Sequence, residues 1–371
     1  MIFTLPTKQP RVTQGPMLYL DQFFGDRTLL LLDEDTDGVD WSPQLQHIEK
    51  FVANNHITTI VIHGAINPVN IDLSQNAQIP SLIEMQKQLS DLATTHLLTG
   101  DFYYYYNPTP GIVFFPTFLW LNSSKLMGTY FKERADTVYD IEFAEKIKTL
   151  MCLNANTSWH RIYLFSLLAN KPWVNDVGYS FHARTGHSPK LSFESRLDEF
   201  GITQYMTQSE RALARSYAHL LPITLPEDSI TDKRKSSVHS WIYQSYAINL
   251  VTETSLSEGV MLTEKISKTF TAYQIPILIA PPGSSQFLED LGLDMFDDYI
   301  PWKTWDHLTD HKLRIKMIVE FLDSLLSSPT AEQDILLAHS NFKSRLIKNK
   351  EYFHSTEFQN LLLASIKSCT I

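Results

Sequence analysis

The sequence predicts an α/β protein of two domains, and three observations support this expectation. Short apolar runs typical of buried strands alternate with segments whose apolar residues recur at helical spacing. A charged segment at 132–146 interrupts the alternation, and the same pattern then starts again. The chain of 371 residues is long for one hydrophobic core and sufficient for two. We therefore place a domain boundary near residue 140.

The first part of the chain shows four apolar runs that we interpret as strands. They are "RTLLLLDEDTDG" (27–38), "ITTIVIHG" (57–64), "HLLTGDFYYYYN" (96–107) and "GIVFFPTFLWL" (111–121). Helices are expected between them, at 43–55 and at 81–95.

The second part repeats the alternation. Strands are expected at 147–154, 245–254 and 277–280. Helices are expected at 160–170, from Glu264 to Tyr273, at 313–328 and over the last forty residues. Pro276 should separate the helix that starts at Glu264 from the strand that follows it.

The composition is that of a folded, water-soluble chain. Apolar residues make up 43% of the sequence and charged residues 19%, and no run of 18 apolar residues could span a membrane. The N-terminus has no apolar signal core and only two cysteines are present, so we expect a cytoplasmic protein without a disulfide framework. A net charge of −10 argues against broad binding to nucleic acid. The basic stretch at 231–237 is interpreted as a charged surface loop.

Several familiar site patterns are absent or incomplete. No G-x-G-x-x-G, G-x-x-x-x-G-K-[ST] or G-x-S-x-G motif occurs, and no H-x-x-x-H pair encloses a glutamate. The segment 33–44 starts like a calcium loop, with Asp33, Asp35, Asp37 and Gly38 in register, but its twelfth position is Gln44 instead of a glutamate. We therefore expect no bound metal and no cofactor.

Two strand-to-helix junctions carry residues that suggest a ligand site. At the first, a strand ends at Asn154 and a helix opens near Arg161. At the second, a strand ends near Glu253 and a helix opens at Glu264 and Lys265. Ligands of open α/β sheets bind at the carboxyl ends of strands, beside helix N-termini whose N–H groups attract phosphate. Arg161 and Lys265 would add positive charge for a diphosphate, and Glu264 would accept hydrogen bonds from a ribose diol.

These two junctions resemble the donor-binding half of the α1,3-fucosyltransferases. The stretch "VTET…GVMLTEKISKTFTAYQIPIL" (251–278) is similar to that family's Phe-Glu-Asn and Val-Thr-Glu-Lys motif, and "CLNANTSWHRIYLFSLL" (152–168) to its upstream Ser-Asn…Arg…Leu segment. The resemblance implies the GT-B fold, in which two Rossmann-like domains face across a cleft and the second holds a nucleotide sugar. It also implies that Arg161 and Lys265 hold the donor phosphates and that Glu264 holds the ribose.

The resemblance also sets the expected domain limits. An acceptor-side domain would span 1–140, a nucleotide-sugar-binding domain 141–325, and C-terminal helices at 326–371 would pack back toward the first domain. The match has departures: Val251-Thr252-Glu253-Thr254 lacks the family's asparagine, and the first domain shows no family motif.

Spacing and position suggest the stereochemistry and the catalytic base. Retaining GT-B enzymes often place two glutamates eight positions apart, whereas Glu258 and Glu264 here are six apart, which favours inversion. An inverting transfer needs a base for the acceptor hydroxyl. Asp101 closes an apolar strand ahead of four tyrosines and is our candidate, although it also fits a simple turn residue. The alternatives are the acids at 33–35 and the weaker His63.

The resulting expectation is an enzyme: a metal-independent glycosyltransferase that moves a sugar from a GDP- or UDP-linked donor to a hydroxyl of a glycan or another acceptor. Its donor site would comprise Asn154, Arg161, Glu253, Glu264 and Lys265. The alternative is a non-catalytic protein that uses the same fold to bind nucleotide sugars or to act as a scaffold.

Overall fold

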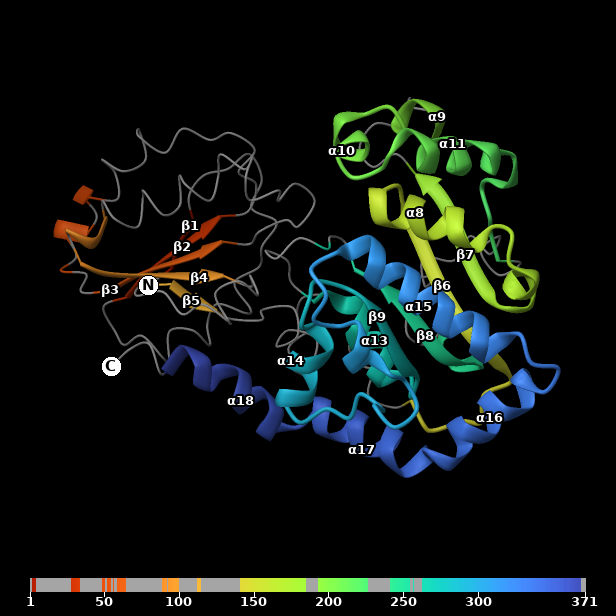
Figure 1. The fold of residues 1–371 in the computed structure, drawn as a ribbon. Helices are drawn as coiled ribbons and strands as arrows, with labels where there is room; N and C mark the ends of the chain where they lie inside the picture. The colour runs from red at the N-terminus through yellow and green to blue at the C-terminus, as the bar shows by residue number, and fades with distance from the viewer. Residues whose placement is uncertain are drawn as a thin grey trace. The chain divides into compact units, whose positions relative to one another are not determined.

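The protein belongs to the α/β class and divides into two compact units (Figure 1). The structure is a computed structural model that describes residues 2–4, 28–33, 49–50, 52–54, 56, 59–64, 89–91, 93–99, 112–114, 141–184, 193–225, 241–253, 256 and 262–367. Unit 1 comprises residues 1–135, 257–263 and 354–371, and unit 2 comprises 136–256 and 264–353. The GT-B arrangement and the domain limits drawn from it stay predictions.

Unit 1 contains a five-stranded parallel sheet whose strands follow the order of the chain. The strands are β1 (Ile2–Thr4), β2 (Thr28–Asp33), β3 (Thr59–Gly64), β4 (Thr94–Thr99) and β5 (Ile112–Phe114). Strands β2 and β3 pair along six residues each, from Thr28 opposite Thr59 to Asp33 opposite Gly64. Helix α18 (Thr356–Lys367) contacts β5.

Unit 2 is built on a four-stranded parallel sheet with the order β7-β6-β8-β9. The strands are β6 (Lys148–Asn156), β7 (Gly178–Arg184), β8 (Tyr246–Thr252) and β9 (Ile275–Ile279). The chain runs from β6 outward to β7, returns past β6 to β8, and continues outward to β9. The direction of winding therefore reverses between β6 and β8, which is a topological switch point.

Helices cover the sheet of unit 2 in two groups (Figure 1). The first group consists of α8 (Trp159–Leu168), α11 (Gln208–Ser216) and α15 (His311–Leu326), and the second of α13 (Glu264–Thr271), α16 (Ala331–Asn341) and α17 (Lys343–Phe353). Because crossovers between parallel strands are right-handed, α8 after β6 and α13 after β8 lie on opposite faces.

Short helical segments complete unit 2. They are η3 (Pro172–Asp176), α9 (Phe193–Arg196), α10 (Phe200–Thr203), η4 (Ala218–Leu220), α12 (Trp241–Ser245), α14 (Ser284–Asp290) and η7 (Trp302–Thr304).

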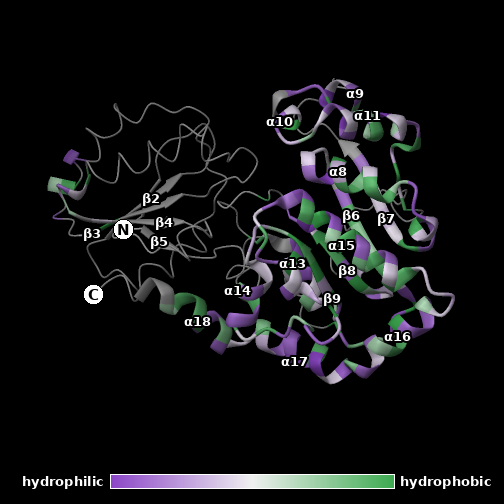
Figure 2. Cartoon of the chain, viewed as in Figure 1, coloured by the Kyte–Doolittle hydropathy of each residue, from purple (hydrophilic) through white to green (hydrophobic). Residues whose placement is uncertain are grey.

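The core of unit 2 lies between its sheet and the two helix groups. Strands β8 and β9 are buried along their whole length, as expected for strands covered on both faces. Figure 2 shows β8 largely in the hydrophobic colour, whereas α17 is largely hydrophilic. On the α8 side, the rings of Phe165 and Phe181 are completely buried with their centroids 5.3 Å apart.

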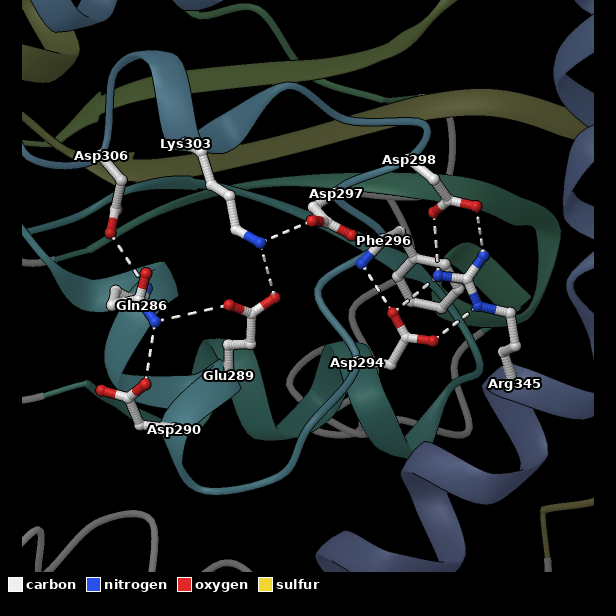
Figure 3. Close-up of polar contacts among 10 residues, drawn as sticks. All are labelled: Gln286, Glu289, Asp290, Asp294, Phe296, Asp297, Asp298, Lys303, Asp306 and Arg345. Carbon is white, nitrogen blue, oxygen red and sulfur yellow. Dashed lines mark hydrogen bonds and ion pairs between the residues drawn. The ribbon is translucent and has the colours of Figure 1, made fainter.

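An ion-pair network holds the loop that follows α14 (Figure 3). Arg345 on α17 binds Asp294 with Nε at 2.6 Å and Asp298 with Nη1 at 2.8 Å. Lys303 binds Asp297 at 2.5 Å and Glu289 at 3.2 Å. Each of these four carboxylates thus has a cationic partner, and the loop is fixed to both α14 and α17.

Most strands and helices expected from the sequence are confirmed wherever the structure describes them. The strand expected at 277–280 instead starts at Ile275 and includes Pro276. Proline is tolerated there because β9 is an edge strand and loses no ladder bond through the missing N–H. Helix α13 stops at Thr271, and Tyr273 takes the left-handed conformation with φ 57°. Strands β1 and β7 and helices α9, α10, α11 and α12 were not expected from the sequence.

Candidate functional site

The sequence-predicted residues of unit 2 gather at the carboxyl ends of β6 and β8, at the switch point. Asn154 lies near the carboxyl end of strand β6, and Arg161 lies in the first turn of helix α8. Glu253 directly follows β8, while Glu264 and Lys265 open α13. The crevice at such a reversal is where ligands of open α/β sheets bind.

Glu253 is the centre of this arrangement and is completely buried. Its N–H donates to the carbonyl of Ile279 on β9 at 2.9 Å. Its carbonyl oxygen lies 3.0 Å from Nε2 of His160 and accepts from Nη2 of Arg161 at 3.2 Å. Its carboxylate pairs with Nζ of Lys265 at 3.3 Å. Main chain and side chain of Glu253 thus connect β9, α8 and α13.

Arg161 is buried beneath this edge, with 5% of its surface exposed. Its Nη2 also donates to the carbonyl of Thr252 at 3.1 Å, so two successive carbonyl dipoles at the end of β8 face the guanidinium. Lys265 differs, because a quarter of its side chain remains exposed. The structure therefore brings both predicted cations to Glu253, one inside the protein and one within reach of solvent.

Asn154 forms part of the bonding between β6 and β8. Its Oδ1 accepts a hydrogen bond from the hydroxyl of Thr252 at 2.5 Å, and its Nδ2 donates to Sγ of Cys152 at 3.2 Å. Asn154 and Thr252 are both almost completely buried. Burial raises the pKa of the Cys152 thiol to about 12, so it stays protonated at neutral pH. Asn154 contributes rigidity to the strand ends at the switch point.

His160 is a site residue that the sequence analysis did not single out. It is 1% exposed, and burial, together with the nearby charge of Arg161, holds the pKa of its ring well below the usual value. Its Nε2 lies 3.2 Å from Oγ of Ser158 and 3.0 Å from the carbonyl of Glu253. The sequence shows that His160 precedes Arg161, but the residue that His160 contacts, Glu253, is remote in the chain.

The N-terminus of α8 makes no side-chain capping bond, although Ser158 occupies the cap position. The helix has no acidic residue in its first turn. Arg196 of α9 donates from Nε to Oγ1 of Thr157 at 3.3 Å and fixes the loop that leads into the helix. This end of α8 is therefore positive and structurally held.

The N-terminus of α14, at the end of β9, is occupied by a carboxylate of the chain itself. Asp306 accepts hydrogen bonds from the backbone N–H groups of Ser285 at 3.1 Å and Gln286 at 3.0 Å. Burial raises the pKa of Asp306 above its usual value. The end of α8 thus differs from that of α14 in having no side-chain cap, and the N–H of Arg161 there donates to the carbonyl of Ser158 at 3.1 Å.

Some predicted residues fall beyond what the structure covers. Asp101, the candidate base, lies outside the described residues. Asp33 ends β2 and His63 lies in β3, while 34 and 35 are also outside the described residues. Of Glu264, the structure gives the helical backbone position at the start of α13.

In the described part of the chain, no three His, Cys, Asp or Glu side chains gather so as to hold a metal ion. None of the described helices combines the length and apolar character needed to cross a membrane.

Comparisons of the chain with protein-family models, curated proteins and solved structures found no match.

Proposed function

We propose that the chain is a glycosyltransferase that moves a sugar from a nucleotide-diphosphate sugar to an acceptor hydroxyl. The main support for this proposal is that Arg161 and Lys265 both bind Glu253, at the switch point of a parallel α/β sheet. A nucleotide diphosphate needs cationic stabilisation at the carboxyl ends of strands, and this edge supplies two cations and the N-terminus of α8.

The two cations would have different tasks. Lys265 is partly exposed and would contact the diphosphate directly while it keeps its pairing with Glu253, because its ammonium has three N–H donors. Arg161 is buried and would add positive potential from below while it holds the end of β8. Stabilisation of charge on the departing diphosphate by such fixed cations is how a transferase can work without an obligatory metal.

The inverting stereochemistry, the catalytic base and the ribose contact are inferred from the sequence. In an inverting GT-B reaction the acceptor oxygen attacks the anomeric carbon while the bond from that carbon to the diphosphate oxygen breaks. The hydroxyl proton passes to a carboxylate, for which Asp101 is the candidate. Glu264, at the start of α13, would accept hydrogen bonds from the ribose.

Donor binding tests the proposal directly. The full-length protein is screened by thermal shift against UDP-, GDP-, ADP- and CMP-sugars, where a ligand at 100 times its Kd adds about 2.7 kcal/mol of stability. For the sugar nucleotide that binds, Lys265→Ala should weaken binding by about one to two decades, because a charge-assisted hydrogen bond is worth roughly 1.5–3 kcal/mol.

Lys268 provides a matched control on the same helix. Its ammonium lies over the ring of Tyr243 at 5.9 Å, so Lys268→Ala should leave the donor Kd nearly unchanged. An unaltered Kd in Lys265→Ala, or an equal loss in both variants, would reject the donor site. Tight binding without transfer or hydrolysis of the sugar would instead assign a non-catalytic nucleotide-sugar-binding protein.

A further inference from the structure

The carbonyl of Glu253 marks the point where the chain leaves β8, and two side chains of α8 hold it. Nε2 of His160 lies 3.0 Å from this oxygen and Nη2 of Arg161 lies 3.2 Å from it. The same residue carries the carboxylate that pairs with Lys265. Any movement of this carbonyl would therefore also move the carboxylate that pairs with the partly exposed Lys265.

The protonation of His160 follows from its partners. A carbonyl oxygen only accepts hydrogen bonds, so Nε2 must carry the proton that faces Glu253. Because the ring is buried beside the Arg161 charge, its pKa is depressed and the ring is neutral. Nε2 is then a fixed donor, and the hydroxyl of Ser158 at 3.2 Å lies within its reach as a second acceptor.

We infer that His160 is a positioning residue of the proposed donor site: its Nε2–H fixes the main chain of Glu253, which keeps Lys265 where the diphosphate binds. Arg161 binds the same carbonyl through Nη2, which also donates to the carbonyl of Thr252, so His160 and Arg161 hold the end of β8 together. The inference rests on the proposed function for its ligand and on the contacts of Glu253 for its geometry.

Two amide substitutions separate positioning from space filling. In His160→Gln the side-chain amide N–H group lies as many bonds from the main chain as Nε2 of histidine, whereas in His160→Asn it is one bond shorter. Both replacements are polar and neutral. The Gln variant should therefore restore the hydrogen bond to Glu253, and the Asn variant should not.

Binding of GDP and UDP, and of guanosine and uridine, is measured by calorimetry for each variant at a temperature where circular dichroism shows it folded. His160→Asn should raise the Kd of the diphosphate that wild type binds by roughly 2- to 10-fold, the effect of one hydrogen bond. The nucleoside Kd should stay unchanged, and His160→Gln should match wild type. A purely structural defect would lower nucleoside and diphosphate binding alike.

Trace acetylation of the folded protein reports on Lys265 without any ligand. The reactivity of Lys265, divided by that of Lys268 on the same helix, should change in His160→Asn and return in His160→Gln. An unchanged ratio, or equal diphosphate affinity in both variants, overturns the inference. If wild type binds none of the nucleotides whose sugars are screened, the proposed function fails, and the acetylation ratio alone decides whether His160 positions Lys265.

Discussion

Buried cations of unit 2 are held mainly by main-chain carbonyls rather than by carboxylates. Nζ of Lys146 donates to the carbonyls of Gln244 at 3.0 Å and Ala272 at 2.8 Å, and burial lowers its pKa to about 7. Nη2 of Arg314 donates to the carbonyl of Ala280 at 2.5 Å. Arg161 follows the same rule at the end of β8. Carbonyl dipoles stabilise a buried positive charge at the ends of strands and helices, because the carbonyls there are not all used in strand or helix hydrogen bonds.

Two buried histidines, His160 and His339, and the half-buried His311 predict a loss of stability in acid. Burial lowers the pKa of His311 and of His339 to about 4 and that of His160 well below its usual value. Between about pH 6.5 and 4 the unfolded chain therefore binds protons that the folded chain does not, so the free energy of unfolding falls as pH falls. Urea unfolding should give a lower midpoint at pH 5 than at pH 7.5.

His339→Gln provides the test for one of these histidines. Nε2 of His339 lies 2.8 Å from the carbonyl of Tyr273, a contact that a glutamine amide can reproduce without titrating. The variant should lose less stability between pH 7.5 and pH 5 than wild type does. An identical loss would show that His339 is not among the groups responsible.

Sequence reasoning reached Arg161 and Lys265 because both stand where a strand gives way to a helix, and such junctions attract anionic ligands. The roles of His160 and of the Glu253 carbonyl could not be predicted from the sequence. Their contact joins residues that are remote in the chain, and it depends on strand order and on the depth of burial, neither of which leaves a periodic pattern.

At the scale of elements, near-continuous apolar runs made β6, β8 and β9 predictable, because strands covered on both faces leave such runs. Strand β7, "GYSFHAR", mixes polar and apolar residues and occupies an edge of the sheet, and it was missed. Helix α11 carries a capping box between Thr207 and Glu210, which is a sequence signal for a helix N-terminus.

Gly178 at the start of β7 should not tolerate a side chain. A Cβ at this position would lie 2.4 Å from Cζ of Tyr246, whose ring is buried at the start of β8. Gly178→Ala should therefore lower the free energy of unfolding by about 1–3 kcal/mol, the usual cost of overpacking a core. Chemical denaturation measures the effect. Unchanged stability would mean that Tyr246 can move aside, and a crystal structure of the variant would show where.

At the scale of the whole molecule, alternating patterns predicted two α/β parts, because each parallel sheet needs helices between its strands. The order β7-β6-β8-β9 was beyond prediction, since periodicity reports burial and not which strands are neighbours. The switch point between β6 and β8 follows from that order. The residues of the candidate site could thus be named from the sequence, but their location at this reversal could be recognised only in the structure.

Unit 2 has a sheet and a hydrophobic core of its own. Strands β6 to β9 form one sheet, and both helix groups that cover it belong to the same unit. The fragment 136–353 should therefore fold without the rest of the chain, with a cooperative thermal transition.

Within this fragment, Phe165→Ala should cost roughly 3–5 kcal/mol of unfolding free energy, because the ring is completely buried against Phe181. A fragment that melts without cooperativity, or tolerates this substitution, would show that the core depends on residues outside 136–353.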